Sequence, residues 1–419
     1  MKLTRLLLTG ALFLAPSLLA QDYESFAGMR FRFEAPGARN AAMGGTSEAL
    51  EDTFSTNPAA LARIRERRVS VDARRSTAET EFITSGTIGS FQTMSLAAKS
   101  SGIQSATVVI PTRAATLALF VDEPMNSSFS TNALPRGERA GVVIGIRDNQ
   151  LVPSTDCPLF GEAAPSEDHC NFAFFDTPVA LRADTRVSLR RMGGVVAFGR
   201  GPVSFGASVQ YAHLEERASA DGVENRANGS RVTWSAGGQW QISPTVRAGA
   251  SYRSGAKFAA TRTFSDPQIV YPVRSFNTPS SYGAGLAFDV APNVTIAIDA
   301  VRVRYNKMLA GVNPFTTTAD DLFLYVMPDV TELHAGGEVR IPTRIPVSLR
   351  AGWWRDPAHR IRIQADAPAW LLSYNTLLRD EDEDHVTAGI GVGDRIRLDA
   401  AIDKSEHTTR GSLTIASTF

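Results

Sequence analysis

From about residue 69 to the end of the chain, apolar and polar side chains alternate with a period of two. In the stretch RIRLDAAID, Ile396, Leu398 and Ile402 fall on one face of an extended chain, whereas Arg397 and Asp399 fall on the other. Successive side chains of a β-strand point to opposite faces, so this alternation predicts strands with one apolar face. The stretches RVTWSAGGQWQI, YGAGLAFDV and LHAGGEVRI repeat the pattern, and helical periodicity is almost absent from this part of the chain.

The connections between these stretches distinguish a membrane barrel from a soluble sandwich, since both architectures produce such alternation. Short turns at one end and long loops at the other are typical of outer-membrane barrels. The polar face, which is rich in Gly, Ser, Gln and isolated charges, then lines the lumen. Short connections at 200–202, 242–244, 291–293 and 393–395 alternate with long polar ones at 83–103, 125–183, 215–229, 257–279, 307–330 and 357–384.

The pattern therefore predicts an all-β fold, a transmembrane antiparallel β-barrel of about fourteen strands over residues 69–419. An even number of strands is what a closed single-chain bacterial barrel requires. In RRMGGVVAFG the apolar positions change face at Gly193 and Gly194, which we interpret as a β-bulge. The predicted strands are 69–82, 104–111, 115–124, 184–200, 203–214, 230–242, 245–256, 280–290, 294–306, 331–341, 346–356, 385–393, 395–404 and 408–419.

The chain ends inside a strand pattern, on Phe419, with Leu413 and Ile415 on the same face. Chain ends fray unless they are tied down, and closing a barrel pairs the last strand with the first. A terminal aromatic on the lipid face also resembles the signal that outer-membrane proteins present to the barrel assembly machinery. Tyr211, Tyr252 and Trp353 are expected in an interfacial aromatic girdle.

The first twenty residues, MKLTRLLLTGALFLAPSLLA, read as a secretory signal peptide. Lys2 and Arg5 precede an apolar stretch that is shorter than the roughly 20 residues of a spanning helix. The cleavage site falls after Ala20 or after Ser17. Residues 1–20 are therefore excluded from the predicted fold.

The charge composition and the two cysteines of the chain bear on its partners and its compartment. Lys+Arg 43 and Asp+Glu 43 balance, which gives no electrostatic case for nucleic acid as a partner. In an oxidising compartment, Cys157 and Cys170 are predicted to form a disulfide that closes a small surface loop. Zinc is the alternative, supported only by the neighbouring His169, because no further ligands are evident nearby.

Residues 21–68 have a different composition and are predicted to form a hatch inside the barrel. The segment is rich in Ala and has two short runs of helix formers. Thr46 or Ser47 could cap the first run, and Asn57 could cap the second, with Pro58 at its first helical position. Its apolar side chains favour a place within the lumen rather than in water.

GARNAAMGG followed by ALEDTFSTNPAALA resembles the N-terminal hatch of the FadL/TodX family of outer-membrane transporters for long-chain fatty acids and hydrophobic compounds. Stretches of residues 278–307 and 332–357 resemble the later hairpins of that barrel, so the resemblance runs from about residue 26 to 419. The matching hatch residues are Gly37, Arg39, Met43, Gly44 and Gly45, then Asn57, Pro58, Ala59 and Leu61.

The resemblance implies a fourteen-stranded barrel closed by a hatch, with the start of the mature chain contributing to a hydrophobic binding pocket. Phe26, Met29, Phe31 and Phe33 are therefore candidate ligand contacts; the alternative is that they only pack the hatch against the wall. The loop 125–183, with its cysteines, departs from the family pattern and leaves the outer binding surface open.

The remaining chemistry-bearing residues have structural interpretations. The acidic run 380–384 is predicted to be a solvated external loop, with Ca²⁺ binding as the alternative. His334 is expected to pack against the hatch, and no histidine lies beside a Gly-x-Ser-x-Gly serine, so hydrolysis is not supported. No cofactor or metal is expected. Inward-facing charges are predicted to pair with one another and with the hatch, although one could meet a substrate carboxylate; they are Asp289, Asp299, Glu338, Arg340, Arg350, Arg397 and Asp399.

The sequence thus predicts a non-enzymatic outer-membrane protein that lets long-chain fatty acids or aromatic hydrocarbons cross by passive diffusion. It would be a monomer surrounded by outer-membrane lipid and lipopolysaccharide, without nucleic acid. The alternative is a shuttle or scaffold protein of a secretion system that has the same fold and carries no small molecule. A water-filled porin is disfavoured, because it would not need the segment 21–68.

Overall fold

The computed structural model describes residues 31–33, 35–51, 55–84, 92–131, 145–147, 150–152, 169–170, 183–220, 223–258, 263–264, 277–308, 325–360, 362–363 and 380–419. Within these residues the chain is almost entirely antiparallel β-sheet. No described helix is long and apolar enough to cross a membrane.

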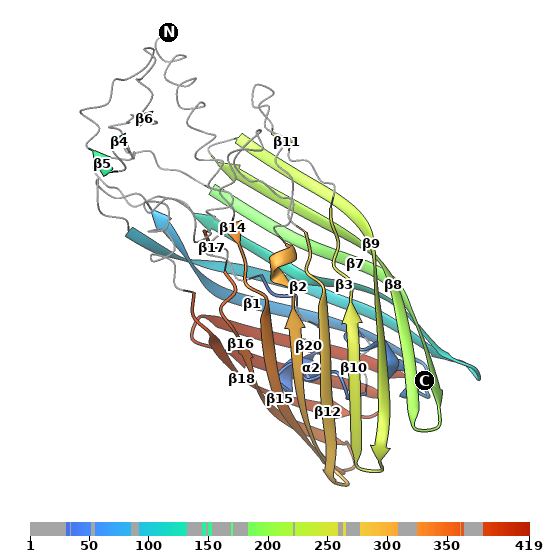
Figure 1. Cartoon of the computed structure of the whole chain (residues 1–419). Helices are drawn as coiled ribbons and strands as arrows, with labels where there is room; N and C mark the ends of the chain where they lie inside the picture. The colour runs from blue at the N-terminus through green and yellow to red at the C-terminus, as the bar shows by residue number, and fades with distance from the viewer. Residues whose placement is uncertain are drawn as a thin grey trace.

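Fourteen strands form one closed antiparallel barrel, which confirms the predicted fold (Figure 1). Neighbours in sequence are neighbours in the sheet, and closure comes from the pairing of the first barrel strand with the last. The strands are β1 (Arg68–Thr84), β2 (Gln92–Pro111), β3 (Thr116–Thr131), β7 (Ala183–Arg200), β8 (Val203–Ala220), β9 (Val223–Ser243), β10 (Val246–Arg253), β12 (Ser281–Ala291), β13 (Val294–Val303), β15 (Val330–Ile341), β16 (Val347–Asp356), β18 (Glu383–Gly393), β19 (Ile396–Lys404) and β20 (Thr408–Thr418).

Each predicted strand corresponds to a barrel strand, but several are longer than predicted. β2 begins at Gln92 and β3 ends at Thr131, while β8 and β9 together leave only residues 221–222 between them. The predicted loops 83–103 and 215–229 are therefore largely strand. The prediction was wrong because these outer portions of the strands carry polar residues on both faces.

The predicted bulge at Gly193 and Gly194 is also wrong. Both residues pair in continuous register with β3 and with β8, and the irregularity lies on β3, between Asp122 and Met125. The apparent change of face arises because Val195 turns inward and packs on apolar residues from the N-terminal part of the chain.

The barrel is apolar outside and polar inside. Val232, Phe205 and Ile396 are 68%, 64% and 72% exposed on the outer surface, whereas the inward carboxylates of Glu338 and Asp399 are buried. A soluble sandwich would place its apolar face inward, so this arrangement is that of a barrel whose outer wall meets lipid.

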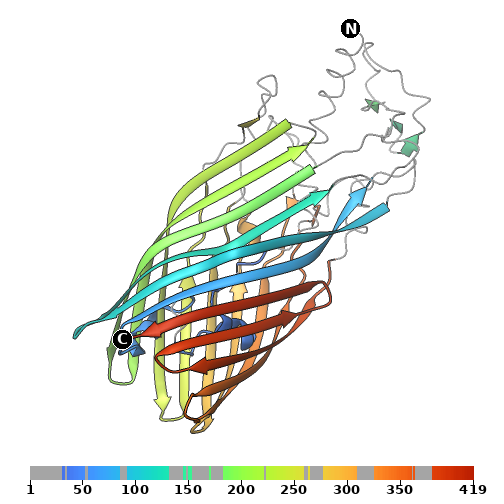
Figure 2. The ribbon, with the colours of Figure 1, turned by 180° about the vertical axis from the view of Figure 1, so that it is seen from behind.

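The C-terminus lies within the barrel wall, and the amide of Phe419 donates to the carbonyl of Arg67 at 3.0 Å. Its position is marked in both views (Figures 1 and 2). The smaller elements are the α-helix α2 (Ala38–Ala42), the 3-10 helices η1 (Pro58–Arg63) and η3 (Tyr305–Lys307), and the short strands β4 (Gly145–Arg147), β5 (Gln150–Val152), β6 (His169–Cys170), β11 (Thr263–Phe264), β14 (Tyr325–Val326) and β17 (Arg362–Ile363).

The described residues before β1, called here the N-terminal segment, lie inside the barrel (Figure 2). Helix α2 contacts β16, β18, β19 and β20, whereas η1 contacts β3, β7, β8 and β9 on the opposite side of the ring. The segment therefore crosses the lumen from wall to wall.

Candidate functional site

Ion pairs across the lumen attach the N-terminal segment to the wall. Arg39 on α2 donates to Glu338 on β15, with Nε at 3.0 Å from Oε2. The same carboxylate accepts from Arg350 at 2.6 Å, and Arg350 also donates to Asp399 at 2.8 Å. Because these groups are buried, each charge needs an opposite partner. The predicted pairing of inward charges with one another and with the hatch is confirmed for Glu338, Arg340, Arg350, Arg397 and Asp399. Asp299 instead accepts from backbone amides of the segment.

Gly44 and Gly45 bring the segment backbone against the wall. Their φ angles are +65° and +79°, a region that side chains disfavour. A Cβ on Gly44 would lie 2.6 Å from the carbonyl oxygens of Ala335 and Trp353. The amide of Gly44 donates to Thr387 Oγ1 at 3.0 Å, and its carbonyl lies 2.7 Å from His334 Nδ1. His334 thus packs against the segment as expected.

Asn57, Pro58 and Ala59 form the other corner of the segment. Asn57 Oδ1 accepts from the amide of Ala59 at 3.0 Å, and Pro58 is the first residue of the helix, so the predicted cap is confirmed. The helix is a 3-10 turn rather than an α-helix. Asn57 Nδ2 also donates to the carbonyls of Glu48 at 2.8 Å and Gly238 at 3.2 Å, so one side chain joins both arms of the segment to β9.

The predicted cap at Thr46 or Ser47 is wrong, because in the described residues no helix begins there. The amides of Ser47 and Glu48 donate instead to Asp299 Oδ2 on β13, at 2.9 Å for Glu48. The barrel wall supplies the acceptor that a cap would have supplied. Burial, and then the nearby charge of Asp299, raise the pKa of Glu48 to about 7.

An apolar cluster fills the lumen at the end where the long loops begin. Phe31 is buried in it, Phe33 packs against it, and Phe26 and Met29 lie outside the described residues. Their roles as ligand contacts stay predictions. The cluster comprises Phe31, Met125, Val187, Leu189, Ala212, Leu214, Ala227, Ala256, Phe258, Val301, Val303, Tyr305, Met308, Met327 and Val330.

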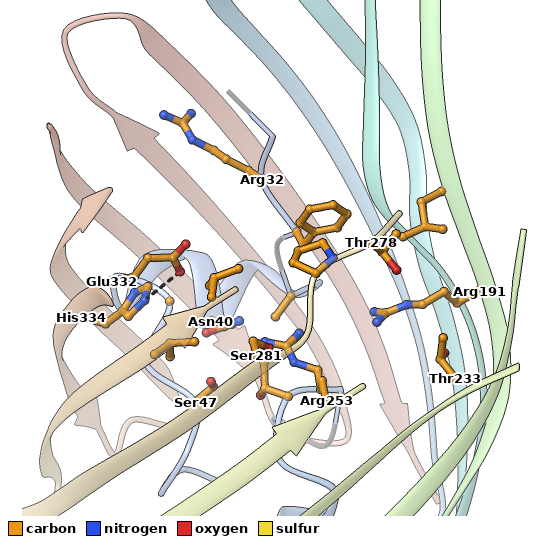
Figure 3. Close-up of a pocket in the computed structure, with 18 of the residues that line it drawn as sticks. Arg32, Asn40, Ser47, Arg191, Thr233, Arg253, Thr278, Ser281, Glu332 and His334 are labelled. Carbon is orange, nitrogen blue, oxygen red and sulfur yellow. Dashed lines mark ion pairs between the residues drawn. The ribbon is translucent and has the colours of Figure 1, made fainter. Parts of the chain in front are cut away.

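A cavity of about 130 Å³ lies between this apolar cluster and residues 40–47 of the N-terminal segment. Phe33, Val301 and Tyr305 line it on the cluster side, while Asn40 and Ser47 line it on the segment side. The wall contributes polar groups directed into the space, as Figure 3 shows for Arg191, Thr233, Arg253, Ser281, Glu332 and His334.

The two wall arginines of the cavity differ in their partners. Arg191 makes a bidentate pair with Asp122, with nitrogen to oxygen distances of 2.9 and 2.6 Å. Arg253 makes no ion pair and no side-chain hydrogen bond to any part of the chain that the structure describes, and its guanidinium faces the cavity (Figure 3). Glu48 and Glu332 act on its charge only from a longer distance. An unpaired guanidinium in a lumen is suited to binding an anion.

The acidic run and the cysteine pair are both predicted to lie in the long loops. The acidic run 380–384 is only partly a solvated loop, because Glu383 begins β18 and its side chain is buried in the lumen, paired with Arg32. Asp382 pairs at the surface with Arg355. The disulfide predicted between Cys157 and Cys170 stays a prediction, since Cys157 lies outside the described residues.

Sequence reasoning missed Arg253 and Arg32, two cations of the lumen. Arg253 ends a strand whose parity places it inward, which is the only signal that could have found it. Arg32 pairs with Glu383 and Asp356, residues far away along the chain. No local pattern reveals such a contact.

Fold and lumen together define a closed fourteen-stranded barrel with a polar interior crossed by the N-terminal part of its own chain. Several solved structures have this fold. The Ralstonia pickettii toluene transporter TbuX superposes with a TM-score of 0.56 at 12% identity, over 93% of this chain and 100% of the other. A Pseudomonas aeruginosa FadL homologue gives 0.57 at 12% identity, over 93% and 99%.

The P. putida toluene transporter TodX gives a TM-score of 0.56 at 14% identity, over 92% of this chain and 99% of the other. No protein-family model and no curated relative matches the chain. The chain therefore shares the fold of FadL/TodX-type transporters, as its sequence predicts. These structures are described as transporters and not as enzymes.

Proposed function

We propose that the protein is an outer-membrane transporter through which hydrophobic molecules, long-chain fatty acids or aromatic hydrocarbons, cross by passive diffusion. The observation that carries this proposal is the layered lumen: an apolar cluster at the loop end, a cavity beneath it, and α2 with the residues that follow it beneath the cavity. A porous channel would not need that segment.

The layers support a sequence of steps. Apolar side chains at the loop end favour a hydrophobic molecule that leaves the lipopolysaccharide layer. The cavity beside Phe33 and Tyr305 then holds it, and the segment below has to shift before it can pass. Side-chain hydrogen bonds and ion pairs hold the segment in place. These contacts can break while the barrel strands stay paired, so such a shift requires no unfolding of the barrel.

Arg253 favours ligands with a carboxylate head over neutral hydrocarbons. Arg253 is half-buried and has no ion-pair partner among the described residues. Withdrawing its charge from water has a cost, which a ligand carboxylate would offset.

Aromatic hydrocarbons are the second ligand class of the proposal, because two solved structures with this fold are described as toluene transporters. In the proposed cellular setting the barrel is a monomer, surrounded by outer-membrane lipid and lipopolysaccharide and inserted by the assembly machinery through Phe419.

Uptake of labelled oleate and labelled toluene tests the function directly. Cells that carry the protein should take up at least one of the two faster than cells without it, with other outer-membrane proteins at equal abundance. A shuttle or scaffold protein of a secretion system would leave both rates unchanged. Equal uptake of both compounds with and without the protein would therefore reject the transport proposal.

A further inference from the structure

A cluster of buried ionisable side chains lies near the loop end of the barrel, where β16 ends and β18 begins. Asp356 and Glu383 are directly opposite in the register of these strands, and His385 follows on the same face of β18. All three side chains are buried, and one potential ligand atom from each lies within 4.8 Å of the others.

Arg32 of the N-terminal segment neutralises this cluster. Its Nε donates to Asp356 at 2.8 Å, it pairs with Glu383, and its guanidinium lies 5.6 Å from the ring centre of Trp354. Two buried carboxylates of the wall are thus balanced by a cation that belongs to a different part of the chain. If the segment shifts, these carboxylates lose that cation.

His385 is oriented as metal-binding histidines are. Its Nδ1 lies 2.8 Å from Asp403 Oδ1, and its ring stacks on Trp354 with centroids 3.9 Å apart. The other ring nitrogen, Nε2, is fully buried, has no hydrogen-bond partner among the described residues, and lies 3.8 Å from Glu383 Oε2. A carboxylate behind an imidazole whose second nitrogen faces further carboxylates is the usual support of a histidine ligand.

We propose that Asp356, Glu383 and His385 bind a divalent cation of the zinc type, and that this cation and Arg32 compete for the same place. One imidazole nitrogen with two carboxylate oxygens suits zinc better than the all-oxygen sites of Ca²⁺ or Mg²⁺. Tetrahedral zinc holds its ligand atoms about 3.3 Å apart. The ligand atoms of Asp356, Glu383 and His385 lie within 4.8 Å of one another, so small side-chain rotations would bring them to that distance.

Because of this competition, the cation binds the wall residues only when the N-terminal segment is undocked from them. A ligand that binds only when Arg32 has left shifts the equilibrium away from the docked arrangement by mass action. The nearby surface pair of Asp382 with Arg355 is outside the cluster and takes no part. The site does not depend on transport, so its test needs only purified protein.

The test is titration of the tag-free, detergent-purified full-length protein with ZnCl₂, without reducing agent, by calorimetry. Arg32→Ala should bind one Zn²⁺ per barrel with a Kd at least tenfold lower than that of the wild type. Adding His385→Gln to Arg32→Ala should abolish this binding. The matched control is Arg32→Ala with His407→Gln, which removes a nearby, partly exposed histidine outside the cluster and should leave the affinity unchanged.

Heat-modifiable migration on gels verifies that each variant is a folded barrel. If Arg32→Ala does not fold, Arg32→Gln takes its place in the titration. X-ray absorption at the zinc edge of the bound variant should show one imidazole in a shell of nitrogen and oxygen. Equal zinc affinity in the wild type and the Arg32 variants would overturn the proposal. So would retention of binding after His385→Gln.

Discussion

A few residues determine how the N-terminal segment passes through the lumen. Gly44 fits because a Cβ there would collide with wall carbonyls, and Asn57 fits because it bonds to its own helix and to β9. Both residues could be selected from the sequence, since positive φ and helix capping are local requirements. Arg32 could not, because its partners Asp356 and Glu383 come together only after the barrel closes. For Arg253, strand parity indicates the inward direction but not the absence of an ion-pair partner.

Glu48 should make docking of the segment depend on pH. Its pKa is raised from 4.5 to about 7 by burial, so its contribution to the docked state is fully present below about pH 4.5 and is lost as the pH rises through about 7. The full effect is on the order of 3 kcal/mol. Hydrogen exchange of residues 35–51, corrected for intrinsic rates, should be faster at pH 8 than at pH 5 in the wild type.

Glu48→Gln should remove most of that difference, because the amide does not titrate. A pH dependence that is the same in Glu48→Gln and in the wild type would show that another group is responsible.

Arg253 should discriminate between ligand classes. Arg253→Gln is expected to lower oleate uptake severalfold and to leave toluene uptake near the wild-type rate, because only the acid has a carboxylate to bind. Arg226, which pairs with Glu224 at the exposed end of β9, provides the matched control Arg226→Gln. If both variants behave alike toward oleate, Arg253 does not contact the ligand head.

Element by element, the period-two pattern located every barrel strand but not every strand end. Alternation reports the part of a strand that has one apolar and one polar face, and β2, β8 and β9 continue as polar hairpins beyond it. Helices were harder to place, since the amides of Ser47 and Glu48 found an acceptor on β13 and no helix formed there. Tertiary contacts, rather than local propensity, decided the conformation of the segment.

The loop between β3 and β7 carries a prediction that rests on sequence alone. A bridge between Cys157 and Cys170 would close a loop of about 14 residues and contribute roughly 3 kcal/mol to local order in the chain-entropy account. Mass spectrometry of non-reduced peptides should find the two cysteines linked. Two free thiols in the purified protein would be incompatible with that bridge.

For the whole molecule, the parity of turns and loops sets the orientation in the membrane. Asp382 lies at the loop end, and Asn293 lies exposed in the turn between β12 and β13. On intact cells, Asp382→Cys should react with a membrane-impermeant thiol reagent more than the unsubstituted protein does, and Asn293→Cys should not. Labelling of position 293 alone would mean that the barrel is inserted the other way round.

The central claim is that hydrophobic molecules cross the barrel past a segment held in one geometry. The most direct measurement is labelled oleate and toluene uptake by cells carrying Gly44→Val with Asn57→Ala, at equal surface abundance. The double variant removes the close approach of Gly44 to the wall and the helix cap of Asn57 at the opposite corner. A helix cap of this kind contributes about 1 kcal/mol. Gly411→Val, where an added Cβ meets open space, is the control.

The double variant should form a folded, heat-modifiable barrel in which hydrophobic uptake falls well below that of the wild type and of Gly411→Val. Leakage of small hydrophilic solutes would accompany a segment that no longer fills the lumen. Hydrophobic uptake at the wild-type rate in the double variant would contradict the claim, because transport would then not depend on how the segment is held.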